Sequence, residues 1–217
     1  MGKHNNNKYA SVPRDLFPTP SWCTEAFLEH FDVSGKRVWE FATGNGDMAE
    51  VLKAEGASVY CSDIEQREYP LDAQFDFLSD HDPRQLSFAW GRSLPAFDAF
   101  DWFISNPPYG FRCRLINPFI EIGLRRLGPN GALALLLPND CDSAKERIRY
   151  FGACTAFDTK IILTKRIVWF ERTDGKPESP KENHCWCVWR RSRQPGRRPQ
   201  ILYEPSMMTA HLAQAAE

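Results

Sequence analysis

The chain has 217 residues, of which 42% are hydrophobic and 25% are charged, and its formal net charge is −1. This composition fits one globular domain with a sizeable core. It gives no global basic field, so any contact with nucleic acid must come from local patches. No apolar stretch is long enough to span a membrane, and residues 1–8 are too polar for a signal peptide.

The seven cysteines form an odd, irregularly spaced set, which is typical of reduced thiols. We therefore expect a cytoplasmic protein. The run His184-Cys185-Trp186-Cys187 could bind a metal, but it lacks a second ligand pair at zinc spacing. It reads better as a strand, and we expect no metal site.

The first part of the chain predicts a parallel βαβ unit. Residues 1–16 are polar and are expected to be flexible, and Phe17-Pro18-Thr19-Pro20 follows them. Apolar periodicity and Gly/Pro punctuation then predict, in chain order, a helix over 21–31, a strand over 36–41, a helix over 48–55 and a strand over 57–62. A strand, helix and strand in this order indicate an α/β fold.

The later part of the chain continues this alternation and ends in strands. The pattern predicts, in chain order, a strand over 97–104, a helix over 116–127, a strand over 132–137, a helix over 143–151 and strands over 160–163, 167–170 and 184–190. The purely apolar run 132–137 is typical of a central parallel strand. The last two strands, joined by a polar loop, indicate an antiparallel edge. No repeat or linker divides the chain, so we expect a single domain over 17–190 and a basic tail over 191–217.

A Gly-rich turn, Glu40-Phe41-Ala42-Thr43-Gly44-Asn45-Gly46, follows the first strand. Gly44 and Gly46 would let the backbone approach a ligand closely. The full dinucleotide fingerprint is absent because position 49 is Ala, which weakens a dehydrogenase interpretation. An ordinary structural turn is the alternative interpretation.

Two acidic positions follow at intervals that suit a nucleoside. Asp63, at the end of the second strand, is placed to hydrogen-bond a ribose diol, with a helix N-cap as the alternative role and Glu65 as a fallback. Asp76-Phe77-Leu78 could hold an adenine ring by its amino group and its face. An ordinary loop with a buried Phe is the alternative there.

The turn Asn106-Pro107-Pro108-Tyr109 directly follows the predicted strand 97–104. Two prolines fix φ and remove two backbone donors, so strand pairing must stop there. The Asn side-chain carbonyl and the Pro107 carbonyl can accept hydrogen bonds from an –NH₂ group and hold its nitrogen in line with an electrophile. The Tyr109 ring offers a stacking face. Because the amine can lose its proton after attack, this chemistry needs no strong general base; a Pro-rich surface turn is the alternative.

In this order, the elements resemble the S-adenosylmethionine-dependent amino-methyltransferases, most closely the N6-adenine DNA methyltransferases in which the cofactor region precedes the catalytic motif. The stretch 184–189 is similar to the final strand of small phage and prophage members. The resemblance covers about residues 17–190. It implies a Rossmann-like methyltransferase fold with a mostly parallel seven-stranded sheet, an antiparallel terminal hairpin and helices on both faces.

The resemblance also implies S-adenosylmethionine as the cofactor and a DNA adenine, flipped out of the duplex, as the target. Matching residue by residue gives a catalytic set of Asn106, Pro107, Pro108 and Tyr109. The implied cofactor-binding set is Thr19, Glu40, Ala42, Gly44, Gly46, Asp63, Ile64, Asp76, Phe77 and Asn106. The implied substrate-binding set is Tyr109, Trp169, Phe170, Arg112, Arg190 and Arg191.

Several features leave alternatives open. Family members that read a defined site carry a separate recognition region, whereas this chain has room only for short loops, so specificity is relaxed or comes from these loops, a dimer or a partner. The arginine cluster 190–198 suits either phosphate contact or a solvated tail. The same turn chemistry serves RNA adenine and the glutamine amide of proteins. An inactive methyltransferase-fold binding module is a third possibility, against which the intact Gly44, Gly46, Asp63 and Asn106 argue.

Overall fold

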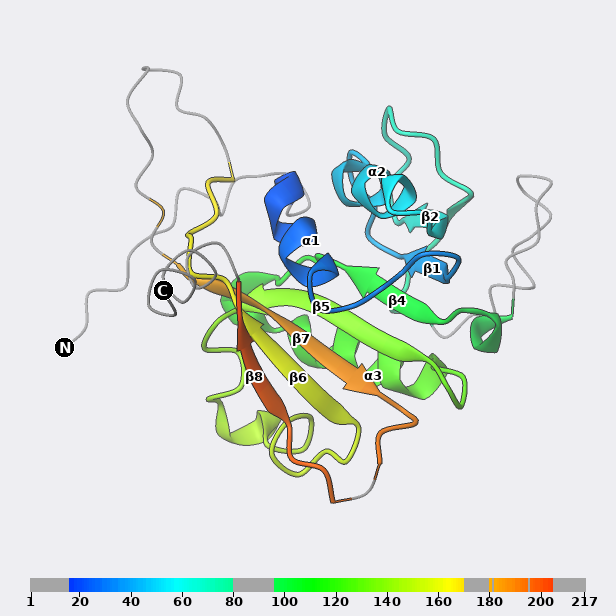
Figure 1. Cartoon of the computed structure of the whole chain (residues 1–217). Coiled ribbons are helices and arrows are strands. Elements are labelled where there is room, and N and C mark those ends of the chain that lie inside the picture. The colour runs from blue at the N-terminus through cyan, green and yellow to red at the C-terminus, as the bar shows by residue number, and fades with distance from the viewer. Residues whose placement is uncertain (1–15, 80–95, 170–179, 181, 195, 205–217) are drawn as a thin grey trace, which may run out of the picture.

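A central β-sheet with helices packed on both faces organises the chain (Figure 1). The computed structural model describes residues 16–79, 96–169, 180, 182–194 and 196–204. Among the described helices, none combines the length and the apolar character that crossing a membrane would require.

The elements alternate in the order that the sequence predicts for an α/β fold. The helices are α1 (Ser21–Leu28), α2 (Asp47–Ala54) and α3 (Ile116–Arg126), with short 3₁₀ turns at Phe97–Ala99, Phe111–Cys113 and Lys145–Arg147. The strands are β1 (Arg37–Glu40), β2 (Ser58–Asp63), β3 (Ala73–Gln74), β4 (Trp102–Ser105), β5 (Ala132–Pro138), β6 (Phe157–Ile162), β7 (His184–Arg190) and β8 (Gln200–Tyr203).

The described strands form one eight-stranded sheet in the order β3-β2-β1-β4-β5-β7-β6-β8. Strands β1 to β5 pair in parallel, β7 runs antiparallel between β5 and β6, and β8 pairs in parallel with β6. The predicted mostly parallel sheet with an antiparallel strand near one edge is therefore confirmed. The strand count is eight rather than the expected seven, because β3 and β8 carry no strong strand signal in the sequence.

Alternating side chains along the central strands divide the core into two layers. On β5, Leu133, Leu135 and Leu137 pack on the α3 side, in the same layer as Ile116 and Phe119 of that helix. The alternate residues of β5 face the layer that contains residues of α1 and α2. Period-two burial on both faces explains why this strand reads as a continuous apolar run.

Two predicted elements differ from the structure. Of the run 97–104, only residues 102–104 belong to strand β4 (Trp102–Ser105), because Phe97–Ala99 is a 3₁₀ turn whose Phe97 ring stacks on Trp39. The predicted helix over 143–151 was wrong: only Lys145–Arg147 makes a 3₁₀ turn. The Arg147 guanidinium there is buried against backbone carbonyls, so tertiary contacts rather than helix hydrogen bonds shape this segment.

The predicted strand over 167–170 was also wrong, in the part that the structure describes. Residues 167–169 form no strand, and Phe170 lies outside the described residues. The position beside β6 belongs instead to β8, within the segment expected to be a basic tail. The Glu204 carboxylate accepts hydrogen bonds from the Thr164 amide and hydroxyl, each at 3.2 Å, and so ties the end of β8 to the bend after β6.

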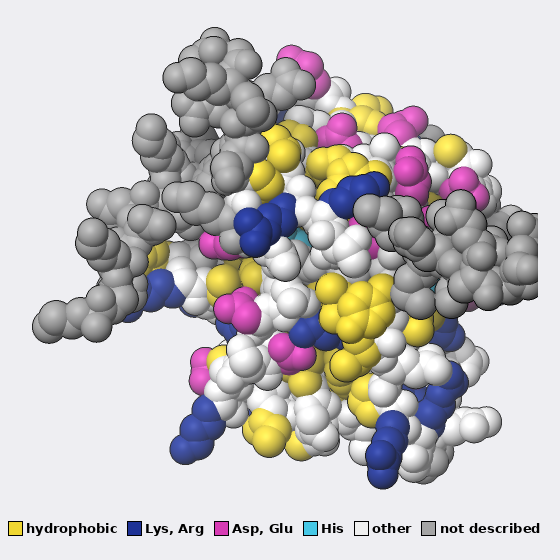
Figure 2. Space-filling model, turned by 60° about the vertical axis from the view of Figure 1, so that its left-hand side comes forward, with side chains coloured by type: hydrophobic (Ala, Val, Ile, Leu, Met, Phe, Trp, Pro, Cys, Tyr) yellow, Lys and Arg dark blue, Asp and Glu magenta, His cyan; other side chains and the backbone are white. Residues whose placement is uncertain are grey.

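The surface does not concentrate one sign of charge on the face drawn in Figure 2. There, exposed hydrophobic side chains lie among Lys, Arg, Asp and Glu side chains. This mixture agrees with the near-zero net charge of the chain.

Candidate active site

A cavity of about 230 Å³ opens at the carboxyl ends of β1, β2 and β4. In open α/β sheets this edge is where ligands bind. Nine of the ten predicted cofactor residues line it, all except Gly46, and so does Pro108. The structure thus brings together residues that lie up to 87 positions apart, from Thr19 to Asn106, although their role stays a prediction.

The Gly-rich turn after β1 lines the cavity and is held in place by hydrogen bonds to the ends of β1 and β2. Gly44 and Gly46 have φ of 56° and 85°, the left-handed region that L side chains rarely adopt. The Thr43 hydroxyl contacts the carbonyls of Glu40 and Ser62 at 3.0 and 3.1 Å. These contacts fasten the turn to the ends of both β1 and β2.

Asp63, at the end of β2, also holds the Gly-rich turn in place. Its Oδ2 accepts a hydrogen bond from the Gly44 amide at 2.9 Å, and its Oδ1 accepts one from the Glu65 amide at 3.0 Å. The carboxylate therefore accepts hydrogen bonds from nearby backbone amides, but it is no helix N-cap, because no helix follows it in residues 64–79, and it also lines the cavity. Each oxygen keeps a lone pair for a further donor.

Glu40 is the most unusual side chain of the cavity. It is 2% exposed, and its Oε2 has no hydrogen-bond partner among the described residues. Burial, followed by repulsion from Asp63 and Asp47, holds the pKa of Glu40 well above its usual value of 4.5. A buried acid with an unpaired oxygen is a site prepared for a donor or a cation.

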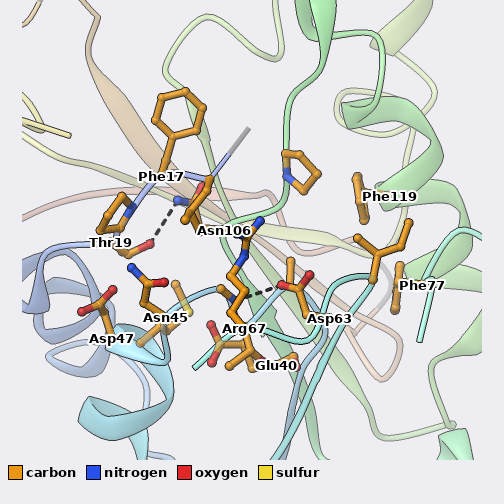
Figure 3. A pocket seen from close by; sticks show the side chains of 18 of the residues that line it. Phe17, Thr19, Glu40, Asn45, Asp47, Asp63, Arg67, Phe77, Asn106 and Phe119 are labelled. Carbon is orange, nitrogen blue, oxygen red and sulfur yellow. Dashed lines mark hydrogen bonds between the residues drawn. The ribbon is translucent and has the colours of Figure 1, made fainter. Parts of the chain in front are cut away.

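The two ends of the cavity differ in character (Figure 3). Thr19, Asn45 and Asp47 form a polar end, and Phe77 with Phe119 forms an aromatic end, with Glu40 and Asp63 between them. The rings of Phe77 and Phe119 lie nearly parallel at 5.8 Å. Four lining residues are acidic (Glu40, Asp47, Asp63 and Asp76), whereas Arg67 is the basic one among them.

Asn106 lies in the cavity wall just after β4, with its amide fixed at both ends. Its Nδ2 donates to the Thr19 hydroxyl at 3.0 Å, and its Oδ1 accepts from the Tyr109 hydroxyl at 3.1 Å. The Tyr109 hydroxyl also lies 3.1 Å from the Leu136 carbonyl of β5. Burial raises the pKa of Tyr109 well above 10, so the phenol stays neutral and is no general base.

A row of aromatic rings extends from this turn towards α1. The Tyr109 ring stacks on His184 at 6.1 Å, His184 meets the edge of Trp169 at 5.2 Å, and Trp169 contacts Phe17 at 5.4 Å. Burial lowers the pKa of His184 to about 4, so its ring is neutral near pH 7. Trp169, which the resemblance implies as a base-packing residue, therefore lies in the same aromatic row as Tyr109 of the predicted catalytic turn.

Two members of the predicted substrate set lie at the opposite edge of the sheet. Arg190 pairs in register with Ala132, at the start of β5, whereas His184 pairs with Pro138, at the cavity end. The Arg190 guanidinium packs over Phe31 and Trp102 and lies 3.6 Å from Asp158, and the Arg191 side chain donates to the Leu127 carbonyl. Both arginines thus have structural contacts far from the cavity, because antiparallel β7 carries them to the far edge.

Several lining residues were missed from the sequence. Asn45 and Asp47 lie in and directly after the Gly-rich turn, so their position was readable in principle. Arg67 and Phe119 come from an irregular segment and from α3, and only the tertiary fold brings them to the cavity.

Three thiols also meet in the core. The Sγ atoms of Cys141, Cys185 and Cys187 lie within 4.8 Å of one another, and all three residues are buried. Cys185 and Cys187 share one face of β7, and Cys141 joins them from the turn after β5. In the described residues this group has three members, one fewer than a structural zinc site uses.

Comparison with known proteins identifies the architecture. No family model matches the chain, and no curated protein sequence matches it significantly. Among solved structures, a Listeria monocytogenes protein assigned as a class I S-adenosylmethionine-dependent methyltransferase aligns with a TM-score of 0.54 and 16% identity, over 89% of this chain and 67% of its own. A predicted O-methyltransferase from Agrobacterium tumefaciens aligns with a TM-score of 0.53 and 18% identity, over 85% of each chain.

A third similar structure is described as a modification subunit of a type I restriction enzyme from Vibrio vulnificus. It aligns with a TM-score of 0.53 and 16% identity, over 96% of this chain, which spans 54% of that subunit. The chain therefore has the fold of the class I S-adenosylmethionine-dependent methyltransferases.

Proposed function

We propose that this protein transfers a methyl group from S-adenosylmethionine to the exocyclic N6 of adenine in DNA. The observation that carries the proposal is the Asn106 amide, oriented by Thr19 and Tyr109 in the wall of an acid-lined cavity. An oriented carbonyl acceptor beside a cavity for a cationic ligand suits transfer to an amine.

The cavity residues fit S-adenosylmethionine better than a dinucleotide. The cofactor carries two positive centres, a methionyl ammonium and a sulfonium, whereas a dinucleotide carries a pyrophosphate that four lining carboxylates would repel. The unpaired Oε2 of Glu40 suits the ammonium, Asp63 suits the ribose, and Asp76 with Phe77 suits the adenine. Once bound, the cofactor would supply an electrophilic methyl group on its sulfonium.

The residues of this chain would then hold and orient the target nitrogen. Asn106 Oδ1 has a second lone pair for an amine hydrogen, and the Pro107 carbonyl is the second acceptor of the turn. Two acceptors point the nitrogen lone pair towards the methyl group and stabilise the positive charge that develops on the amine. Neutral Tyr109 keeps Asn106 in place, and the amine proton leaves to water afterwards.

Aromatic side chains support a base as the target. Tyr109 and Trp169 are partly exposed and provide ring faces beside the turn, where a flipped base must recover the stacking it loses, and the buried His184 ring packs between them. A glutamine amide of a protein would gain little from such a row. The type I modification subunit among the structures with this fold agrees with a DNA target.

Tritium-labelled S-adenosylmethionine, offered in parallel with unmethylated DNA, RNA and a protein extract, tests the proposal. We expect label in DNA, recovered as N6-methyladenine after nuclease digestion. Label confined to RNA or to protein would overturn the DNA assignment, and an absence of label in all three substrates would overturn methyl transfer.

Asn106→Ala tests the turn itself. We expect kcat to fall by at least about 100-fold, the scale of losing one preorganised polar group that stabilises transition-state charge. The cofactor Kd, measured by calorimetry, should change less than about threefold. Asn130→Ala is the matched control, because Asn130 is exposed in the turn before β5, at the opposite edge of the sheet.

A further inference from the structure

The turn that directly follows the catalytic residues is conformationally strained. Gly110, Arg112 and Cys113 have φ of 68°, 53° and 58°. Non-glycine residues adopt this left-handed region at a cost and persist there only where the surroundings enforce it. Such outliers concentrate at functional sites, so the side chains that this turn exposes are candidates for a function.

Buried contacts enforce the shape of the turn. The Leu115 amide donates to the Tyr109 carbonyl at 3.0 Å, which closes the turn onto the catalytic residues. The buried Arg147 guanidinium donates to the Cys113 carbonyl at 3.0 Å. A Cβ at Gly110 would lie 2.7 Å from the Leu115 side chain, so the entry to the turn is closely packed.

The braced turn directs an aromatic ring into solvent. Phe111 is 68% exposed, which is the largest exposure among the exposed large hydrophobic residues that the structure describes. The Arg112 guanidinium lies 5.1 Å from the centre of its ring. The ring follows Pro108, which lines the cavity, by three residues, and a strained turn that holds such a ring in solvent marks a candidate contact surface for a partner.

Two arginines that follow Phe111 in the turn have no acidic partners among the described residues. Arg112 and Arg114 are both exposed, and neither forms an ion pair within the described part of the chain. By contrast, Arg190 and Arg193 at the opposite edge of the sheet both face Asp158. The cations beside the cavity are therefore available for an anion.

We infer that the turn 110–114 is a nucleic-acid contact, in which Phe111 stacks on a base next to the target and Arg112 and Arg114 bind the flanking phosphates. An exposed ring beside two unpaired cations offers a stacking face for a base and charged groups for the phosphates of the same strand. The strained backbone keeps the ring directed outward. This inference rests on the proposed function and defines how the same site holds its polymer.

Phe111→Ala tests the stacking contact. We expect Kd for a short DNA duplex, measured by fluorescence anisotropy, to rise by about 5- to 100-fold, the range for losing one base–aromatic stack. The Kd for S-adenosylmethionine should stay unchanged. Phe111→Trp should retain DNA binding, and Ile201→Ala, which truncates a residue 62% exposed on β8, is the control that should leave it unchanged.

The salt dependence of binding tests the two arginines. Arg112→Ala and Arg114→Ala should each lower the slope of log Kd against log salt concentration by about one, the signature of one lost phosphate contact. Arg37→Ala removes an exposed arginine at the start of β1, at the far edge of the sheet, and should leave the slope unchanged. If these arginines had only a structural role, replacing them would leave the slope of log Kd against log salt concentration unchanged.

The outcomes separate this inference from the proposed function. If the wild-type protein methylates DNA while Phe111→Ala binds DNA as tightly as wild type, the turn has no stacking role and the inference fails alone. Unchanged salt slopes in both arginine variants would likewise reject the phosphate contacts. If the wild-type protein neither binds nor methylates DNA, the proposed function fails as well.

Discussion

The two halves of the candidate site bury titratable groups of opposite character. The proposed cofactor half (hereafter the cofactor half), at the ends of β1 and β2, buries Glu40, and its surroundings oppose the loss of a proton. The proposed target half (hereafter the target half), around β4 and the start of β7, buries His184, and its surroundings oppose the gain of one. A change of pH should therefore alter the stability of the two halves in opposite directions.

The larger effect is expected at His184. Its pKa is about 4 in the folded protein and 6.5 in the unfolded chain, so the unfolded state binds more protons between these values. The stability that neutral His184 allows is complete above pH 6.5 and is lost as pH falls towards 4. Urea unfolding between pH 7 and pH 4 should show that wild type loses on the order of 3 kcal/mol more than His184→Phe does.

His184→Phe keeps a ring between Tyr109 and Trp169 and removes the titrating group. His30→Gln is the control, because this partly exposed imidazole contacts the Tyr203 carbonyl and has no ring contact with Tyr109, Trp169 or Phe17 in the described structure. If wild type and His184→Phe lose stability in parallel on acidification, the target half is not built around a neutral histidine.

Glu40→Gln tests the cofactor half, where stability should fall as pH rises, the opposite of the pH dependence expected at His184. The folded pKa of Glu40 is raised, so the stability of the unliganded protein is complete below pH 4.5 and is lost as pH rises through that raised value. Glu40→Gln should therefore be more stable than wild type at pH 8 and equal to it at pH 4. Urea titrations at the two pH values measure this difference.

The same substitution should weaken cofactor binding. A charged hydrogen bond to a cation contributes about 1.5–3 kcal/mol, so the S-adenosylmethionine Kd of Glu40→Gln should rise by about 10- to 100-fold at pH 8. Calorimetry measures the Kd, and Glu55→Gln, the same chemical change at an exposed position directly after α2, is the control. Equal affinity in wild type and Glu40→Gln would show that the unpaired Oε2 does not meet the cofactor.

The sequence predicts the cofactor half better than the target half, for a physical reason. The Gly-rich turn and Asp63 lie within one βαβ unit, where chain order fixes spatial order, and the Gly44 amide donates a hydrogen bond to Asp63. The target half assembles distant segments. Antiparallel β7 carries His184 to the end of the sheet where the cavity lies and Arg190 to the opposite end, and the sequence does not indicate this direction.

Errors in the predicted elements have a similar origin. The run 167–169 is apolar because Ile167 and Trp169 pack against the core layer of α1, although the backbone there pairs with no strand. The strand β8 is largely exposed at the edge of the sheet, and its apolar run, Ile201 to Tyr203, is only three residues long. The local sequence pattern indicates which residues are buried. Strand pairing at the edge of a sheet depends instead on tertiary contacts, such as the hydrogen bond from the Thr164 amide to the Glu204 carboxylate.

Alanine at Gly46 tests how closely the turn of the cofactor half is packed, and we expect only a small difference in stability from alanine at Gly35. Gly46 and Gly35 both have positive φ, of 85° and 68°, so alanine at either position should cost about 1–2 kcal/mol of backbone strain. At Gly35 a new Cβ has no heavy atom within 4 Å, whereas at Gly46 it would lie 2.2 Å from the Tyr69 ring. That ring would have to move and give up its hydrogen bonds with Glu50 and Lys53. We therefore expect Gly46→Ala to lower the free energy of unfolding by about 1 kcal/mol more than Gly35→Ala in urea titrations, and equal losses would show that Tyr69 does not restrain the turn.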